Sequence, residues 1–533
     1  MSDKRILIIL ESEPIPAWQA WLVQQLTAQC QLSVAIHPVP GRQVNTLLGW
    51  HLQLDRRLFG PKPDAFALRP LDEHLTKVDW RNCPEQDLVL WLCQCPIPPA
   101  LLTQSKQGVL FTAHGSDFKE SGQALGYRAT MHCREIISSS MWWKHGDVAI
   151  CCKEWHSTAY DFNIARGRNE HFWQMASIYC NKALRVLQDK VLPIPVEGGL
   201  RHPINDGPIS TVRTVGMPAN VINGFRYGWR LFKKLFRKRI VREQWMLLLE
   251  KEKAEHSATW PASTQAWEAA FAKYHKLLPP KDVFWADPFL VAHEDRLFLF
   301  IEELPFATDR GYLSAMEVLK DGSVTPPKKI LEKPYHLSYP FVFQYEDKYY
   351  MVPESYEDRS VQLYESVAFP YQWQFKKYLM RDVKAFDSTI CFHEGRWWLF
   401  CTIGTPAGTG DNDALHLFYA DSPISEKWTA HPLNPIVTDV RSARPAGKIF
   451  RSDEQVMPHL PKGSLIRPAQ DCALKYGHGF KLMQIEELTP TTYRERELHH
   501  IRPNWDATLS RTHSFNHANG RVVIDAIRTI SKR

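Results

Sequence analysis

Residues Asp287–Glu302 read DPFLVAHEDRLFLFIE. Two later stretches share this layout: Pro340–Glu354 reads PFVFQYEDKYYMVPE, and Asp387–Cys401 reads DSTICFHEGRWWLFC. In each stretch, apolar and aromatic residues flank a central acidic or glycine-containing pair, which is the pattern of two β-strands joined by a tight turn. The copies begin about fifty residues apart, and that spacing is typical of β-propeller blades.

These repeats predict an all-β, five-bladed propeller over residues 244–533. A fourth unit covers Arg444–Glu497, and a fifth begins at Arg511 and turns at Asn519-Gly520. The fifth unit is one strand short. We expect Gln244–Leu249 to supply that strand, because closing the ring removes an exposed sheet edge.

Polar residues of this region gather at the strand starts, which converge on the axis of a propeller. Asp287, Asp387, Arg444 and His513 open the innermost strands of four units. Buried carboxylates near one axis are costly unless cations or ligand hydroxyls pair with them. Sugar hydroxyls pair with carboxylates and with Arg, so we expect a carbohydrate site there. The alternative is that Asp287 and Asp387 cap blade turns by accepting hydrogen bonds from backbone amides.

The candidate catalytic residues of this site are Asp287, Asp387 and Glu354, since two carboxylates at suitable separation can carry acid–base or nucleophilic chemistry at an anomeric carbon. We expect Arg444 and Arg467 to neutralise the carboxylates or to bind a phosphate. We expect no metal. The candidate substrate-binding residues are Glu302, Glu303, Arg444, Arg467, Asp471, His513 and Trp285.

An ordered series of short motifs runs through residues 245–533: FWADPF at 284–289, HLSYP at 336–340, DST at 387–389, HPLNP at 431–435, ARPAG at 443–447, RPAQD at 467–471 and YG at 476–477. This series resembles the propeller of plant glucosamine inositolphosphorylceramide transferases and their bacterial relatives. More distantly, it is similar to five-bladed glycosidases such as arabinanases and invertases. That resemblance implies that Asp287 acts as a nucleophile or base. In the plant enzymes, a separate glycosyltransferase domain carries the transfer.

Residues 1–190 alternate strand-like and helix-like segments. Short apolar runs between helices favour a mainly parallel sheet that is covered on both faces, and therefore an α/β domain. The expected strands are 6–10, 32–36, 87–93, 108–112 and 147–152, and the expected helices are 18–30 and 171–187.

The stretches Leu88–Leu92 and Gly108–His114 resemble the core of formyltransferases that use 10-formyltetrahydrofolate. That family carries Asn-x-His and a later Asp, and the resemblance implies that His114 orients the formyl transfer. Thr112 stands where the family has Asn, and the Asp position falls near Ala159. We therefore expect a degenerate catalytic motif and weak or absent folate binding. The pocket residues His114, Thr112 and Asp117 are then candidates to bind a nucleotide sugar or another acceptor.

Residues 191–243 predict a linker that ends in a basic amphipathic helix. Eight of the eighteen residues in Phe225–Arg242 are Lys or Arg, and Phe225, Trp229, Phe232 and Phe236 have helical spacing. This composition is typical of a helix that lies on anionic lipid. The alternative is a helix that docks its aromatic stripe between the two domains. Nucleic acid is not an expected partner, because stacking aromatics on a basic sheet are missing.

The composition is that of an ordinary globular protein: 533 residues, 44% hydrophobic and 23% charged, with a net charge of +7. The absence of a signal-like or membrane-spanning run predicts a cytoplasmic protein. The basic helix adds the expectation that it is peripheral on the inner face of the membrane. We expect a transferase that acts on a sugar or sugar conjugate in making bacterial surface glycoconjugates, with a nucleotide sugar as donor and a sugar or sugar-lipid as substrate. The alternatives are glycoside hydrolysis or phosphorolysis by the propeller, and a non-catalytic sugar-binding scaffold.

Overall fold

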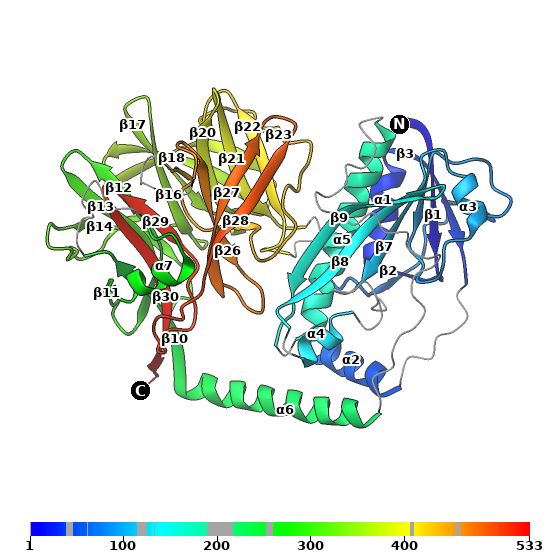
Figure 1. Ribbon diagram of the computed structural model, residues 1–533, viewed down its shortest axis with the longest axis horizontal. Helices are drawn as coiled ribbons and strands as arrows, with labels where there is room; N and C mark the ends of the chain where they lie inside the picture. The colour runs from blue at the N-terminus through cyan, green and yellow to red at the C-terminus, as the bar shows by residue number, and fades with distance from the viewer. Residues whose placement is uncertain are drawn as a thin grey trace. The chain divides into compact units, whose positions relative to one another are not determined.

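The computed structural model describes residues 2–38, 46–60, 62–114, 125–132, 134–161, 163–188, 217–251, 260–405, 410–452, 457 and 460–532. The chain divides into two compact units, Met1–Phe232 with Thr405–Gly410, and Lys233–Gly404 with Asp411–Arg533 (Figure 1). Helix α6 (Met217–Ile240) contains the sequence boundary between them. The first part of the predicted linker, residues 191–216, lies outside the described residues.

The first unit contains a mixed seven-stranded sheet in the order β5-β3-β1-β6-β7-β8-β9. Neighbouring strands from β5 to β7 are parallel, as predicted, whereas β8 and β9 join antiparallel. The sequence pattern predicts only residues 147–152 as a strand in this last hairpin. The strands are β1 (Ser2–Leu10), β3 (Cys30–Ile36), β5 (Thr76–Lys77), β6 (Leu88–Trp91), β7 (Val109–His114), β8 (Ile136–His145) and β9 (Val148–Thr158), with β2 (Ile15–Pro16) and β4 (Leu68–Arg69) paired separately.

Both faces of this sheet are buried, which explains the unbroken apolar run of β1. Ile6 and Ile8 pack with Trp18 and Phe172, whereas Leu7 packs on the other face of the sheet in a separate cluster. A strand covered on both sides cannot alternate apolar with polar residues. The helices of the unit are α1 (Ala17–Thr27), α2 (Thr46–Phe59), α3 (Pro99–Thr103), α4 (Tyr127–Met131) and α5 (Ile164–Leu187).

The second unit is a five-bladed β-propeller, as the repeats predict. Each blade is an antiparallel sheet. Helix α7 (Thr264–Phe271) and a short 3-10 helix, η1 (Tyr356–Asp358), lie in loops between strands of this unit. From the inside outwards, blade one is β12 (Val283–His293), β13 (Arg296–Pro305), β14 (Tyr312–Val318) and β15 (Lys328–Leu331), and blade two is β16 (Ser338–Tyr345), β17 (Lys348–Glu354), β18 (Ser360–Ala368) and β19 (Gln372–Arg381). Blade three is β20 (Ala385–His393), β21 (Arg396–Ile403), β22 (Leu415–Ala420) and β23 (Thr429–Ala430), and blade four is β24 (Arg444–Pro445), β26 (Leu465–Asp471), β27 (Gly479–Leu488) and β28 (Tyr493–Ile501), with β25 (Phe450–Arg451) also beside β26. Blade five is β29 (Phe515–Ala518), β30 (Arg521–Ser531), β10 (Val241–Leu249) and β11 (His275–Leu277).

Blade five closes the ring with strands from both ends of the unit. Strand β10 pairs antiparallel with β30 along its whole length, and the green and red strands lie side by side in Figure 1. Met246 and Leu248 from β10 pack with Ile524 from β30 in one buried cluster. The prediction that residues 244–249 complete the last blade is therefore confirmed.

Candidate active site at the propeller axis

A β-bulge recurs at the start of the innermost strand in blades one, two and three. The ladder register shifts at Asp287, Tyr339 and Asp387, and these residues have left-handed φ angles of 49°, 45° and 50°. Such backbone costs a non-glycine residue about 1–3 kcal/mol and persists only where the surroundings hold it. The same strained register in three blades marks it as a position that the fold maintains.

Carboxylates hold these bulges across the blade boundaries. Asp287 N donates to Asp525 Oδ2 at 3.3 Å, and Tyr339 N donates to Asp287 Oδ2 at 3.2 Å. Asp387 N donates to Glu354 Oε2 at 3.1 Å. In each case the acceptor belongs to the preceding blade of the ring. One oxygen of Asp287 therefore has the amide-capping role considered above, and the other oxygen stays available for a different role.

That second oxygen, Asp287 Oδ1, is buried and accepts no hydrogen bond from any described residue. His513 Nε2 lies 3.6 Å from it, and His513 Nδ1 lies 2.6 Å from Asp525 Oδ2. The Ser514 hydroxyl and the backbone N–H groups of His513 and Ser514 donate to Asp525, while the Trp245 ring stacks on the imidazole at 4.0 Å. The imidazole is thus held on one edge by Asp525 and faces Asp287 with the other.

Burial and mutual interaction shift the pKa values of Asp287 and His513. Burial raises the pKa of Asp287 to about 8, with further contributions from the nearby carboxylates and opposition from His513. Burial disfavours the charged form of His513, but Asp525 and Asp287 outweigh it and raise the pKa of the imidazole to about 9. Both shifts favour the protonated forms, so Asp287 keeps its proton to a higher pH than an ordinary carboxyl, as a general acid must.

The same three residues offer ligand atoms within 4.8 Å of one another, which is a spacing that suits a metal ion. An imidazole binds a metal through a neutral ring nitrogen. Metal binding at this position would therefore have to displace the proton of His513, whose pKa Asp525 raises most.

Arg444 joins the other two predicted catalytic carboxylates. Its Nε donates to Asp387 Oδ2 at 2.5 Å and its Nη2 to Glu354 Oε2 at 3.0 Å, and Gln470 Nε2 adds a bond of 2.7 Å to Asp387 Oδ2. Burial raises the pKa of Asp387, and Arg444 opposes that rise. The pKa of Asp387 is raised to about 8, as is that of Asp287. Arg444 and Gln470 donate to one Asp387 oxygen and favour its charged form, whereas Asp287 Oδ1 has no donor among the described residues.

Partly exposed side chains border the buried cluster. The Arg444 guanidinium lies 5.0 Å from the centre of the Tyr476 ring, and its Nη1 donates to Asn412 Oδ1 at 3.1 Å. His336 Nε2 lies 3.2 Å from Glu302 Oε1. Burial lowers and Glu302 raises the pKa of His336, with a net rise to about 9. A phenol, an amide and a charged imidazole at the border suit a ligand rich in hydroxyl or phosphate oxygens.

Two predicted binding residues of blade four have partners within their own blade. Arg467 is fully buried, and its Nε and Nη2 bind Glu495 at 2.8 and 2.6 Å. Asp471 is bound by His500 at 2.8 Å and by Arg502 at 3.3 Å. Arg467 therefore neutralises Glu495, in place of the axis carboxylates for which the sequence suggested it.

Two predicted binding residues of blade one are also engaged elsewhere. Glu303 accepts from Trp285 Nε1 at 3.4 Å and from the Ser314 hydroxyl at 2.8 Å. Trp285 packs in an apolar cluster with residues of blade five. Glu302, one residue earlier, faces His336 and is close enough to Asp287 to raise its pKa. The neighbouring carboxylates of β13 thus have different roles: Glu302 belongs to the axis cluster and Glu303 to the packing between blades.

In the first unit, His114 belongs to a buried row of polar side chains. Its Nδ1 lies 2.8 Å from Ser139 Oγ, which lies 2.7 Å from His171 Nε2. Burial lowers the pKa of His114 to about 4, so the ring is neutral near pH 7. Thr112 Oγ1 lies 2.6 Å from the Tyr179 hydroxyl. Asp117 lies outside the described residues.

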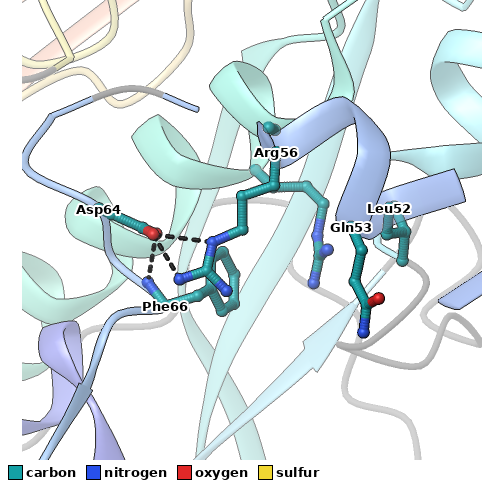
Figure 2. Close-up of a pocket in the computed structure, with 7 residues that line it drawn as sticks. Leu52, Gln53, Arg56, Asp64 and Phe66 are labelled. Atoms are coloured by element: carbon teal, nitrogen blue, oxygen red, sulfur yellow. Dashed lines mark hydrogen bonds and ion pairs between the residues drawn. The ribbon is translucent and has the colours of Figure 1, made fainter. Parts of the chain in front are cut away.

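A cavity of ≈ 150 Å³ also lies in the first unit, beside α2 and α5 (Figure 2). Arg56 Nε donates to Asp64 at 2.8 Å, and the Arg168 guanidinium lies 4.6 Å above the Phe66 ring. A cavity of this volume could hold a molecule about the size of benzene or several waters. None of the predicted site residues that the structure describes is among those lining it: Leu52, Gln53, Arg56, Asp64, Phe66, Ala165 and Arg168.

Residues 247–516 match the family model described as Glucosamine inositolphosphorylceramide transferase 1, N-terminal, which covers half of the chain. The chain belongs to this family. Curated glucosamine inositolphosphorylceramide transferases 1 from Oryza sativa subsp. japonica and Arabidopsis thaliana are 38% identical to it over 215 and 218 residues. Each alignment covers 40% of this chain, and the chain spans only 27% of the length of those relatives.

Solved structures similar to this family member include a family 117 glycoside hydrolase of Zobellia galactanivorans, with a TM-score of 0.33 and 10% identity over 54% of this chain and 90% of that one. A GH62 α-L-arabinofuranosidase of Coprinopsis cinerea has a TM-score of 0.33 and 10% identity over 46% and 92%. A GH43 enzyme from Xanthomonas citri has a TM-score of 0.33 and 11% identity over 47% and 88%. At these values, no catalytic residue is transferred from them.

Asp525 and His336 belong to the axis cluster, although the sequence pattern did not single them out. Asp525 lies beyond the residues that match the glucosamine inositolphosphorylceramide transferase 1 N-terminal model. One signal could have found it: it is the acidic residue in the otherwise apolar run VVIDAI of β30. A carboxylate inside such a strand is buried, and a buried carboxylate needs partners.

Proposed function

We propose that this chain is an enzyme that transfers a group at the sugar of a sugar conjugate, and that the reaction takes place at the propeller axis. The observation that supports this proposal is that two buried carboxylates, Asp287 and Asp387, have different surroundings. Asp287 has a raised pKa and an oxygen without a donor among the described residues, whereas Arg444 and Gln470 donate to Asp387 and favour its charged form.

In the proposed reaction, Asp287 donates its proton to the oxygen that leaves the anomeric carbon. Asp387 and Glu354, which both accept hydrogen bonds from Arg444, stabilise positive charge as that bond breaks. The hydroxyl of an acceptor then bonds to the anomeric carbon and loses its proton to the Asp287 carboxylate. With water as acceptor, the same groups would carry out hydrolysis, so the identity of the acceptor distinguishes transfer from the hydrolase alternative.

The names of the relatives support a sugar-lipid acceptor, since they are glucosamine inositolphosphorylceramide transferases. We propose an inositol phosphate-containing or other glycosylated lipid as acceptor and a nucleotide sugar as donor, in the assembly of a bacterial surface glycoconjugate. The cysteines that the structure describes are free thiols, which supports a reducing, cytoplasmic location.

The test is a transfer assay with the full chain, nucleotide sugars and inositol phospholipids, read by mass spectrometry of the lipid product. Asp287→Asn is nearly isosteric and removes the proton donor, so turnover should fall by about 100-fold or more. The matched control is Asp321→Asn, at an exposed turn that pairs with Ser323. Unchanged turnover in Asp287→Asn would remove the axis from the chemistry, and free sugar as the sole product would identify a hydrolase.

A further inference from the structure

Helix α6 (Met217–Ile240) has a composition that its fold alone does not require. Its 24 residues include seven Lys or Arg and no Asp or Glu. Among the helices of the described residues, none is long and apolar enough to cross a bilayer.

One side of α6 presents a row of large apolar side chains to the surroundings. Phe225, Trp229, Phe232, Phe236 and Ile240 are 77%, 52%, 58%, 59% and 50% exposed. At about 100° per residue, these five positions fall within an arc of about 80°. They therefore form one narrow apolar stripe rather than scattered exposed residues, and the exposure of such a stripe to water is unfavourable.

The opposite side of α6 packs on the first unit. Tyr227 is buried with Tyr127 and Ile164, and its hydroxyl donates to Asp55 Oδ1 at 2.7 Å. Arg230 Nη2 donates to the Thr130 carbonyl at 3.2 Å. Because Tyr227 projects from the side opposite the stripe, this packing fixes the rotation of the helix and turns the stripe away from the first unit.

The charges of α6 identify the surface that the stripe fits. The cations Arg226, Lys233, Arg237 and Arg239 are exposed on the same helix. A stripe of Trp and Phe beside Lys and Arg, without one acidic residue, complements the apolar–polar boundary and the phosphates of an anionic leaflet. We propose that α6 binds the surface of an anionic lipid bilayer, with its stripe among the headgroups and its cations on lipid phosphates. This proposal does not rest on the reaction at the propeller axis.

The test measures sedimentation of the full chain with phosphatidylcholine vesicles that contain or lack phosphatidylglycerol, at low and at high salt. Wild type should bind the anionic vesicles at low salt, bind them less at high salt and ignore the neutral ones. The charge variant Arg226→Gln, Lys233→Gln, Arg237→Gln, Arg239→Gln should bind about 100-fold more weakly or worse. The stripe variant Trp229→Ser, Phe236→Ser should lose the salt-resistant part of binding.

A matched control removes the same charge from the propeller surface, by Lys281→Gln, Lys320→Gln, Lys427→Gln and Lys462→Gln, all at exposed positions. It should bind like wild type, and all variants should keep the wild-type melting temperature. Failure of wild type to sediment with anionic vesicles at low salt would overturn the proposal. Equal losses in the control and charge variants would overturn it too, as would binding to RNA without binding to vesicles.

Discussion

His513 Nε2 lies 3.6 Å from Asp287 Oδ1, while Nδ1 of the same ring lies 2.6 Å from Asp525 Oδ2. The two carboxylates therefore act on one imidazole from opposite edges, and they are 238 positions apart in the chain. Asp525 receives several fixed donors, whereas Asp287 Oδ1 receives none from the described residues. A ligand hydroxyl bonded to Asp287 Oδ1 would therefore leave the bonds that orient His513 intact.

The propeller should lose stability as the pH rises from about 6.5 to about 9, because the folded state raises the pKa of His513 across that window. The contribution is complete below the unfolded pKa and lost as the pH passes the folded pKa, and a shift of this size corresponds to about 3 kcal/mol. Asp287, with its own raised pKa, acts in the same direction between about 3.8 and 8. Urea unfolding across this pH range measures the slope.

In that experiment, His513→Gln should flatten the slope above pH 6.5. His517→Gln is the matched control: His517 is also buried in blade five, but burial lowers its pKa to about 3, so it stays neutral throughout. A His513→Gln protein with the wild-type slope would show that His513 does not titrate as the geometry requires.

Arg444→Met should destabilise the propeller by about 3–5 kcal/mol, because Asp387 and Glu354 lose their shared cation while buried. Adding Asp387→Asn to that variant should recover part of the loss. Arg441→Met, three residues away, breaks a pair with Asp439 that is partly exposed to solvent, so it should cost less than Arg444→Met, about 1 kcal/mol. Similar unfolding free energies for Arg441→Met and Arg444→Met would contradict this account.

Gly447→Ala should cost more than about 2 kcal/mol of unfolding free energy. Gly447 has a φ of 146°, and an added Cβ would stand 2.0 Å from the Phe515 carbonyl oxygen, where blades four and five meet. Gly463→Ala tests backbone strain without a steric clash, because Gly463 has a φ of 82° and an added Cβ would have no atom within 4 Å. Thermal unfolding should rank the two variants in that order, and an equal effect would mean that backbone strain alone matters.

Folate should bind the first unit weakly or not at all. Thr112 offers a hydroxyl in place of an amide, and that hydroxyl lies 2.6 Å from the Tyr179 hydroxyl. Calorimetric titration with 10-formyltetrahydrofolate should show no saturable heat, and formyl transfer should be undetectable. Tight binding together with formyl transfer that disappears in His114→Ala would reverse this expectation.

Sequence reasoning reached the propeller because its hairpins repeat with period-two alternation. It reached the axis because it placed Asp287, Asp387, Arg444 and His513 near the starts of the innermost strands. It could not separate Arg467 from Arg444. Both faces of a blade are buried against neighbouring blades, so alternation does not show which side chain turns to the axis and which to a partner such as Glu495. Asp525 was not predicted because its role depends on Asp287, which lies far from it in the sequence.

In the first unit, the parallel strands could be predicted from apolar runs such as Ile6–Leu10. The strand Ile136–His145 could not, since it reads IISSSMWWKH and three consecutive serines break the apolar run. Those serines are useful only in three dimensions, where Ser139 lies between His114 and His171.

Blade five also determines when the molecule becomes complete. Gln244 and Arg528, which bond to each other across β10 and β30, are 284 positions apart. During translation, the edge of β10 must wait for almost the entire propeller to be synthesised, and ring closure at such separation is expected to be slow. His513 and Asp525 arrive in the same final segment. A stalled or clipped chain can therefore contain folded early blades yet lack the imidazole that faces Asp287. The group of Asp287, His513 and Asp525 is complete only after the propeller has been synthesised and its ring has closed.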